Sequence, residues 1–220
     1  MCISVNAKRH KVELEIFSSY IPNVATLAVL AQHECVNIQT QACYQKQTYR
    51  NRTQIAGANG VLNLSIPIEK GIKGTRLVDQ EVQISYDEMW QNNHWKSFVS
   101  AYQSSPFFEF YQDEFEAVFF KKQKKLLDFN MDILQLIMDW LELDTQIKIS
   151  TEQPLYNPTG EALISAKKAT SLHFPKYIQV FESKLGFISN LNALDLICCL
   201  GPESPSYLKK IDVIPILALS

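Results

Sequence analysis

VELEIF at residues 12–17, VATLAVLA at 24–31 and CVNI at 35–38 are the stretches that decide the fold. The first alternates apolar and polar residues and predicts a strand, and the third predicts a second short strand. The middle stretch is apolar nearly all round, which is typical of a buried helix. A strand, a turn, a buried helix and another strand form a βαβ unit, which implies a parallel sheet.

A hairpin is predicted further along the chain. RTQIA at 52–56 and VLNLSIP at 61–67 flank Gly57-Ala58-Asn59-Gly60, and Asn-Gly between extended runs is a strong hairpin signal. Side chains alternate between the two faces of a strand, so four apolar residues share one face, which should pack into the core. They are Leu62, Leu64, Ile66 and Ile68. Residues 82–86 predict a further short strand.

Helices dominate the second half. Apolar residues at helical spacing predict a helix through 95–102, and Ser105 before Pro106 predicts the N-cap and first turn of the next helix. The other predicted elements, in chain order, are an aromatic helix at 107–119, a long helix at 126–143, a strand at 146–150, a polar mobile loop at 151–170 and an apolar helix at 191–200.

The predicted fold class is α/β, with a mixed sheet that has an N-terminal βαβ unit, a β-hairpin and a helix-rich second half. The 220 residues contain no repeat and no linker, and this length can bury a sizeable core. We therefore predict a single domain over residues 1–220, in which residues 1–12 form an N-terminal segment.

The composition excludes several classes of protein. There are 21 Lys and Arg residues against 23 Asp and Glu, and this near-neutral balance argues against binding to nucleic acid or to a membrane surface. No apolar run approaches the roughly 18 residues of a membrane span, and the N-terminus lacks the residue order of a signal peptide. We predict a cytoplasmic protein with no nucleic-acid partner and no stable membrane insertion.

Neither a cofactor nor a metal site is predicted. None of the 7 glycines falls in GxGxxG or GxxxxGK[ST], so the glycine-rich phosphate loops are missing. HExxH and GxSxG are also absent. The 5 cysteines lack CxxC spacing and are interpreted as reduced thiols, most of them buried.

The most unusual segment is YQKQTYRNR at residues 44–52. Three cations and a hydroxyl on one face suit a diphosphate or a carboxylate, because Arg offers a fork of donors. The alternative is a solvated edge strand whose charges prevent aggregation. If the segment is extended, alternate side chains share one side, namely Lys46, Thr48, Arg50 and Arg52, while Tyr49 and Asn51 face the other.

Two further segments could contribute to a site. His94 borders an apolar helix face; such a histidine is usually structural, but it could act as a general base near neutral pH. Lys96 lies about 200° away around the helix, so it points elsewhere. The turn at residues 18–23 precedes the first helix, where backbone N–H groups could bind an anion, although most such turns are only connections.

These segments, in this order, resemble the WbqC-like protein family of bacteria. The resemblance covers about residues 13–208, and the KQTYRNR form together with LDFN at 127–130 is similar to the Bacteroides-type version. The first turn departs from the family's YFPP, since it reads YIPN at 20–23. The stretches that carry the resemblance are 20–22, 44–52, 58–60, 64–68, 94–97, 101–102, 105–111, 177–181, 186–188, 194–196 and 201–203.

The resemblance implies a cytoplasmic enzyme of O-antigen or other surface polysaccharide precursor biosynthesis. Its substrate would be an anionic small-molecule amino-sugar precursor, phosphate-bearing and nucleotide-linked, and its reaction an acyl or aminoacyl transfer. On this hypothesis His94 is the catalytic acid or base, and the substrate-binding residues are Lys46, Tyr49, Arg50, Asn51, Arg52, Tyr20 and Lys96.

Two alternatives remain. A non-catalytic binding or scaffold protein of the same pathway, with protein partners, would show a large exposed apolar patch. A nucleotide-activating transferase would place its phosphate site in the strand, turn and helix at 13–33, but the histidine pair of such enzymes is missing there.

Overall fold

The computed structural model describes residues 14–71, 76–153, 156–167 and 170–219. The predicted N-terminal segment 1–12 lies outside these residues. Statements of absence below refer to the described residues alone.

A three-stranded parallel sheet forms the N-terminal half of the core. Its strands are β1 (Leu14–Phe17), β2 (Cys35–Gln39) and β5 (Gln146–Ser150), in the order β1-β2-β5. Helix α1 (Val24–Leu30) connects β1 to β2, and all of its residues are buried. The predicted βαβ unit is therefore confirmed. Phe17, Gln39 and Ser150 are in register at the carboxyl edge of this sheet, which becomes important for the site.

The predicted hairpin is confirmed as β3 (Arg52–Gly57) and β4 (Gly60–Ser65), which pair antiparallel around Ala58-Asn59. Gly60 has a φ of 122°, a backbone conformation that favours glycine. Leu64 and Ile66 are buried as predicted, but Leu62 is 45 % exposed because it lies at the turn end of the hairpin. The predicted strand at 82–86 is wrong, since this stretch forms only isolated bridges to residues 68 and 125.

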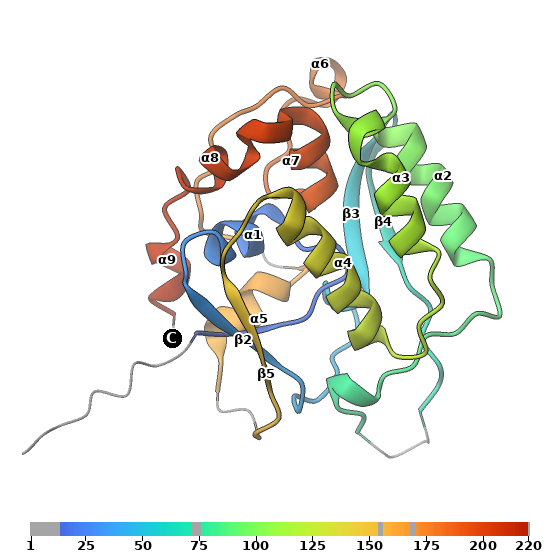
Figure 1. The fold of residues 1–220 in the computed structure, drawn as a ribbon, viewed down its shortest axis with the longest axis vertical. Helices are drawn as coiled ribbons and strands as arrows, with labels where there is room; N and C mark the ends of the chain where they lie inside the picture. The colour runs from blue at the N-terminus through green and yellow to red at the C-terminus, as the bar shows by residue number, and fades with distance from the viewer. Residues whose placement is uncertain (1–13, 72–75, 154–155, 168–169, 220) are drawn as a thin grey trace, which may run out of the picture.

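Three helices cover the hairpin and the sheet (Figure 1): α2 (Trp90–Tyr102), α3 (Phe108–Phe119) and α4 (Leu126–Trp140). Helix α2 packs on β3, and α3 packs on both α2 and α4. The prediction that Ser105 caps the aromatic helix is wrong. Its hydroxyl donates a hydrogen bond of 2.6 Å to the Tyr102 carbonyl and so closes α2, while α3 begins at Phe108.

Short helices complete the second half: α5 (Pro158–Ile164), α6 (Glu182–Leu185), α7 (Ala193–Leu200), α8 (Ser204–Leu208) and α9 (Ile214–Leu217), with 3-10 turns η1 (Asp79–Glu81) and η2 (Gly201–Glu203). Among the described helices, none combines the length and apolarity that a membrane span requires.

Helix α5 corrects the prediction of a loop throughout residues 151–170. The Asn157 side chain accepts a hydrogen bond from the Gly160 N–H, and Pro158 occupies the first turn, where a missing N–H costs nothing. The helix packs on β1. A Cβ on Gly160 would lie 2.9 Å from the Phe17 ring, so this close approach requires glycine.

Candidate functional site

Arg50 is the centre of the candidate site. Its side chain is 1 % exposed, and its Nε donates a hydrogen bond of 2.7 Å to Oδ2 of Asp79. The guanidinium carbon lies 4.3 Å from the centre of the Phe17 ring. Because Phe17 ends β1, the guanidinium lies at the carboxyl edge of the parallel sheet, where open α/β folds place their ligands.

Residues 44–51 reach this position through turns and not as a strand. Gln47 has a φ of 62°, and the Thr48 hydroxyl donates to the Gln45 carbonyl at 2.9 Å, which closes a tight turn. Tyr49 donates its N–H to Ile164 at the end of α5 and accepts at its carbonyl from the Tyr20 N–H. These bonds fix Arg50 between α5 and the turn that precedes α1.

The predicted common face of Lys46, Thr48, Arg50 and Arg52 is therefore wrong. The turns break the alternation of side chains, so that Lys46 is exposed and Arg50 is buried. Arg52 begins β3, half-buried, and its Nε lies 3.1 Å from the Ser65 hydroxyl.

Asp79 is the main counter-charge of Arg50. It begins η1, and its N–H donates to the Ala42 carbonyl at 2.9 Å. Burial raises the pKa of Asp79 to about 6, although the adjacent Arg50 charge and hydrogen bond act to lower it. Asn130 on α4 holds the arginine from the other side, since its Nδ2 donates to the Arg50 carbonyl at 2.8 Å.

The Arg50 guanidinium retains unused donors. Within the described chain neither Nη1 nor Nη2 has a hydrogen-bond partner, and the same holds for Oδ1 of Asp79. A second carboxylate, that of Glu161, lies near the Nη end of the guanidinium. Its Oε1 is 3.8 Å from Nη2, which is too far for a hydrogen bond. Buried polar groups without partners are rare because they cost stability, so such groups mark a place where a ligand could supply the missing bonds.

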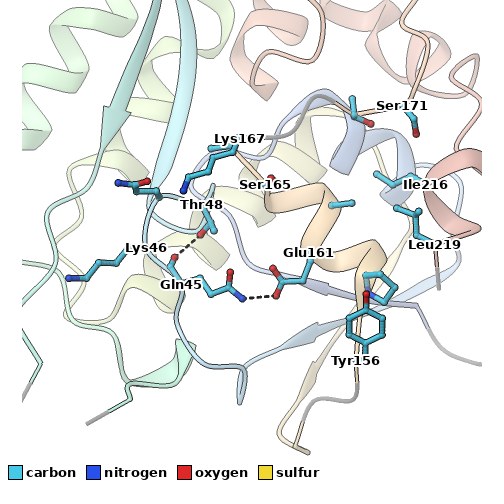
Figure 2. Close-up of a pocket in the computed structure, with 15 residues that line it drawn as sticks. Gln45, Lys46, Thr48, Tyr156, Glu161, Ser165, Lys167, Ser171, Ile216 and Leu219 are labelled. Atoms are coloured by element: carbon cyan, nitrogen blue, oxygen red, sulfur yellow. Dashed lines mark hydrogen bonds between the residues drawn. The ribbon is translucent and has the colours of Figure 1, made fainter. Parts of the chain in front are cut away.

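A cavity of about 610 Å³ lies between residues 45–48 and α5 (Figure 2). Arg50 does not line it, but Glu161 does, and the Glu161 carboxylate lies 3.8 Å from Nη2 of Arg50. Glu161 lines the cavity and accepts a hydrogen bond of 3.2 Å from Gln45 Nε2. Figure 2 shows Lys167 extending toward residues 45–48, whereas Lys46 extends away from α5 at the rim. Ligand pockets commonly measure roughly 300–1,000 Å³, so the cavity has the size for a nucleotide sugar.

Among the other residues predicted from the basic segment, Tyr49 and Asn51 stabilise the base of the hairpin. The Tyr49 hydroxyl donates to Gln54 Oε1 at 2.9 Å, and Asn51 Nδ2 donates to the Ile66 carbonyl at 2.8 Å. Neither residue lines the cavity. The structure thus brings Arg50 and Lys46 to this region and gives Tyr49, Asn51 and Arg52 contacts within the hairpin.

His94 lies in an aromatic cluster away from the cavity lining. Its Nδ1 is 3.0 Å from the Tyr20 hydroxyl, and its ring packs against Trp90 with ring centres 5.3 Å apart. Burial lowers the pKa of His94 to about 4, so the ring is neutral at pH 7. Lys96 is exposed on α2, away from His94. This placement of His94, Tyr20 and Lys96 favours the structural interpretation of the histidine.

The turn at 18–23 leads into α1, where the sequence suggested that backbone N–H groups could bind an anion. Val24 donates its N–H to the Leu191 carbonyl, Ala25 to Asn190 Oδ1 and Thr26 to Asn23 Oδ1, each within 2.9 Å. The backbone donors at the start of α1 are therefore occupied by the protein itself.

Sequence reasoning missed Phe17, Asp79 and Glu161. Phe17 carries no signal beyond that of a strand residue, Glu161 falls in the predicted mobile loop at 151–170, and no pattern in the sequence singles out Asp79. No spacing rule connects them, because Asp79 lies 29 residues from Arg50 along the chain. Asn130 did have a signal, as the last residue of the LDFN stretch.

A second cavity of about 860 Å³ lies between residues 175–180 and the α7–α8 region. Its buried polar groups satisfy one another: Asp195 Oδ2 accepts from the Tyr177 hydroxyl at 2.6 Å and from Gln179 Nε2 at 2.8 Å. No buried side-chain atom in this network lacks a partner. The cavity beside Arg50 is for this reason the stronger candidate.

Metal ligation has no support in the described residues, where no three His, Cys, Asp or Glu side chains come together in a group that could hold a metal ion.

A family model described as the WbqC-like protein family matches residues 18–172, which include Arg50, Asp79, Asn130 and Glu161. The chain belongs to the WbqC-like protein family. This confirms the resemblance to the family, whereas the similarity to a Bacteroides-type version stays a prediction and the C-terminal stretches at 177–203 lie beyond the matched residues. The WbqC-like family is associated with polysaccharide gene clusters. No curated protein and no solved structure matches the chain.

Proposed function

We propose that this WbqC-like protein binds an anionic sugar precursor of O-antigen or other surface polysaccharide synthesis, phosphate-bearing and nucleotide-linked, in the cavity beside Arg50. The observation that carries the proposal is a buried guanidinium with two Nη atoms that lack partners, next to a cavity of about 610 Å³. A guanidinium fork matches the spacing of phosphate oxygens and binds them in bidentate fashion.

The remaining cavity wall suits the rest of such a ligand. Lys167 and Lys46 add two cations near the opening, and Ser171 adds a hydroxyl side chain. The exposed ring of Tyr156 offers a flat apolar surface for a sugar or a base. An anionic head and a polar, partly flat body are therefore both accommodated.

The reaction that we propose for this ligand, in the cytoplasm, is transfer of an acyl or aminoacyl group from an activated donor to the amino group of the sugar. The amine attacks the acyl carbon, the bond from that carbon to its carrier breaks, and the carrier leaves with the proton that the amine loses. We do not assign this reaction to His94, because its side chain is buried among aromatic rings and does not line the cavity. A non-catalytic binding protein of the same pathway would use the same ligand site, whereas a scaffold protein would not bind the ligand. Ligand binding is therefore the first property to test.

The test is a thermal-shift panel of nucleotide sugars, polyprenyl phosphates, and acyl and aminoacyl donors. A ligand at a hundredfold its Kd adds about 2.7 kcal/mol to the free energy of unfolding. For a domain of this size that corresponds to a rise in melting temperature of roughly 5–10 °C. We expect a nucleotide sugar to give this rise, and Lys167→Ala to weaken its binding about tenfold through loss of a charged contact.

Lys124→Ala is the matched control, because Lys124 is also an exposed lysine and lies outside the cavity. Its melting shift should equal that of the wild type. Equal losses of affinity in Lys167→Ala and Lys124→Ala would contradict the proposed location. The absence of any shift across the panel would contradict the proposed ligand class.

A further inference from the structure

We propose that the Glu161 carboxylate occupies the place of the ligand's anionic group and is displaced from Arg50 when a phosphate binds. This inference rests on the proposed function, which it deepens by naming the group that controls entry to the site. Glu161 would act as a built-in competitor whose removal strengthens anion binding.

The first argument is position. Glu161 lines the cavity, whereas Arg50 does not, and Glu161 Oε1 is 3.8 Å from Nη2 of Arg50. The Glu161 carboxylate therefore lies between the guanidinium and the space where a ligand would be. In Figure 2 its side chain extends from α5 toward Gln45, across the inner wall of the cavity.

The second argument compares the two carboxylates around the guanidinium. Asp79 is 4 % exposed and bonded to Nε at 2.7 Å, so it is a permanent counter-charge. Glu161 is 38 % exposed, forms no hydrogen bond to Arg50, and is held by the exposed side chain of Gln45. Weak contacts and access to water make Glu161 the carboxylate that can leave.

The third argument concerns what an incoming anion would gain. Nη1 and Nη2 have no hydrogen-bond partner among the described residues, and the Phe17 ring covers one face of the guanidinium. An oxyanion approaching the outer edge, in the plane of the group, could accept from both nitrogens. Phosphate and carboxylate groups share this chemistry, and the test below separates them.

The experiment is calorimetric titration of inorganic phosphate, acetate and the nucleotide sugars into wild type and Glu161→Gln. The substitution keeps the size of the side chain and its bond to Gln45 but removes the charge. We expect Glu161→Gln to bind phosphate about tenfold more tightly, because the substitution removes a negative charge that repels the incoming anion. Acetate should gain less, because it carries a smaller charge.

Two variants make the result specific. Glu203→Gln removes an exposed carboxylate at the second cavity and should leave phosphate affinity unchanged. The double variant Arg50→Lys with Glu161→Gln should not show the gain in phosphate affinity, because lysine keeps the positive charge but lacks the paired N–H donors of the guanidinium. A gain that survives Arg50→Lys would place the phosphate elsewhere and overturn the inference.

The outcomes separate this inference from the proposed function. If nucleotide sugars bind the wild type through Lys167 while Glu161→Gln binds phosphate no better, the displacement idea fails and the proposed function stands. If Glu161→Gln gains phosphate affinity while no nucleotide sugar binds either form, Glu161 does compete for Arg50 and the proposed substrate class is wrong. If none of the titrated anions binds either the wild type or Glu161→Gln, both the displacement of Glu161 and the proposed function are overturned.

Discussion

Asp79 and Asp195 are two buried carboxylates with opposite surroundings. Burial raises the pKa of each to about 6. Asp195 is satisfied by neutral donors, the Tyr177 hydroxyl and the Gln179 amide, and that network has no atom without a partner. Asp79 faces Arg50, and this pair retains donors and an acceptor that no described residue fills. A shifted pKa thus marks both places, but only unused hydrogen-bonding capacity distinguishes a binding site from a structural network.

The largest expected effect comes from breaking the charged pair. Arg50→Ala would leave Asp79 buried without its counter-charge, and removing one partner of a buried ion pair costs about 3–5 kcal/mol. Denaturant unfolding at pH 7 measures this loss. The double variant Arg50→Met with Asp79→Leu should recover most of the stability, because it removes both charges. A single variant as stable as the wild type would show that the pair makes no net contribution.

The next largest effect is a pH dependence of the free energy of unfolding that comes from Asp195. Its folded-state pKa of about 6 exceeds the ordinary value of 3.8, so the folded protein holds the proton more tightly than the unfolded chain does. The protonated Asp195 carboxyl group therefore makes its full contribution to the free energy of unfolding below about pH 4. This contribution is lost as the pH rises through about 6. The shift corresponds to about 3 kcal/mol.

Asp195→Asn should remove this pH dependence. The variant should lose more stability relative to the wild type at pH 4 than at pH 7, as measured by denaturant unfolding at both values. Glu182→Gln, an acidic residue outside the network, serves as the control. Identical differences at the two pH values would mean that Asp195 does not titrate in this range.

The smallest expected effect comes from binding phosphate at Arg50. Phosphate at ten times its Kd should stabilise the wild type by about 1.4 kcal/mol, and the rise in melting temperature is the readout. Tyr177→Phe, which alters only the closed network, should keep this rise, whereas Arg50→Lys should lose it. Loss of the rise in Tyr177→Phe would show that the two regions are coupled.

The sequence predicted the elements whose signals are local. The βαβ unit and the hairpin follow from apolar runs and an Asn-Gly turn, both readable within a few residues. Helix α5 was missed because its core positions are few and its first residues, Asn157 and Pro158, are equally common in loops. The strand at 82–86 was wrong because the stretch finds no partner strand for more than single bridges.

The site was only half accessible to sequence reasoning. Arg50 was predicted from the cluster of cations in residues 44–52. Its burial, however, depends on turns at Gln47 and Thr48 that no periodicity encodes. Its partners come from a 3-10 turn and a separate helix, and such long-range contacts leave no local pattern. His94 was recognised as ambiguous, and its contact with Tyr20, 74 residues away, decides its environment.

The glycine at position 160 has a consequence beyond helix packing. An added Cβ would lie 2.6 Å from the Asn157 amide and 2.9 Å from Phe17, the residue whose ring covers Arg50. A side chain at this position would therefore require the Asn157 amide, the Phe17 ring or helix α5 to shift, and these groups surround the guanidinium and carry Glu161. The absence of a side chain at residue 160 thus lets the helix that carries Glu161 and the ring that covers Arg50 lie in direct contact.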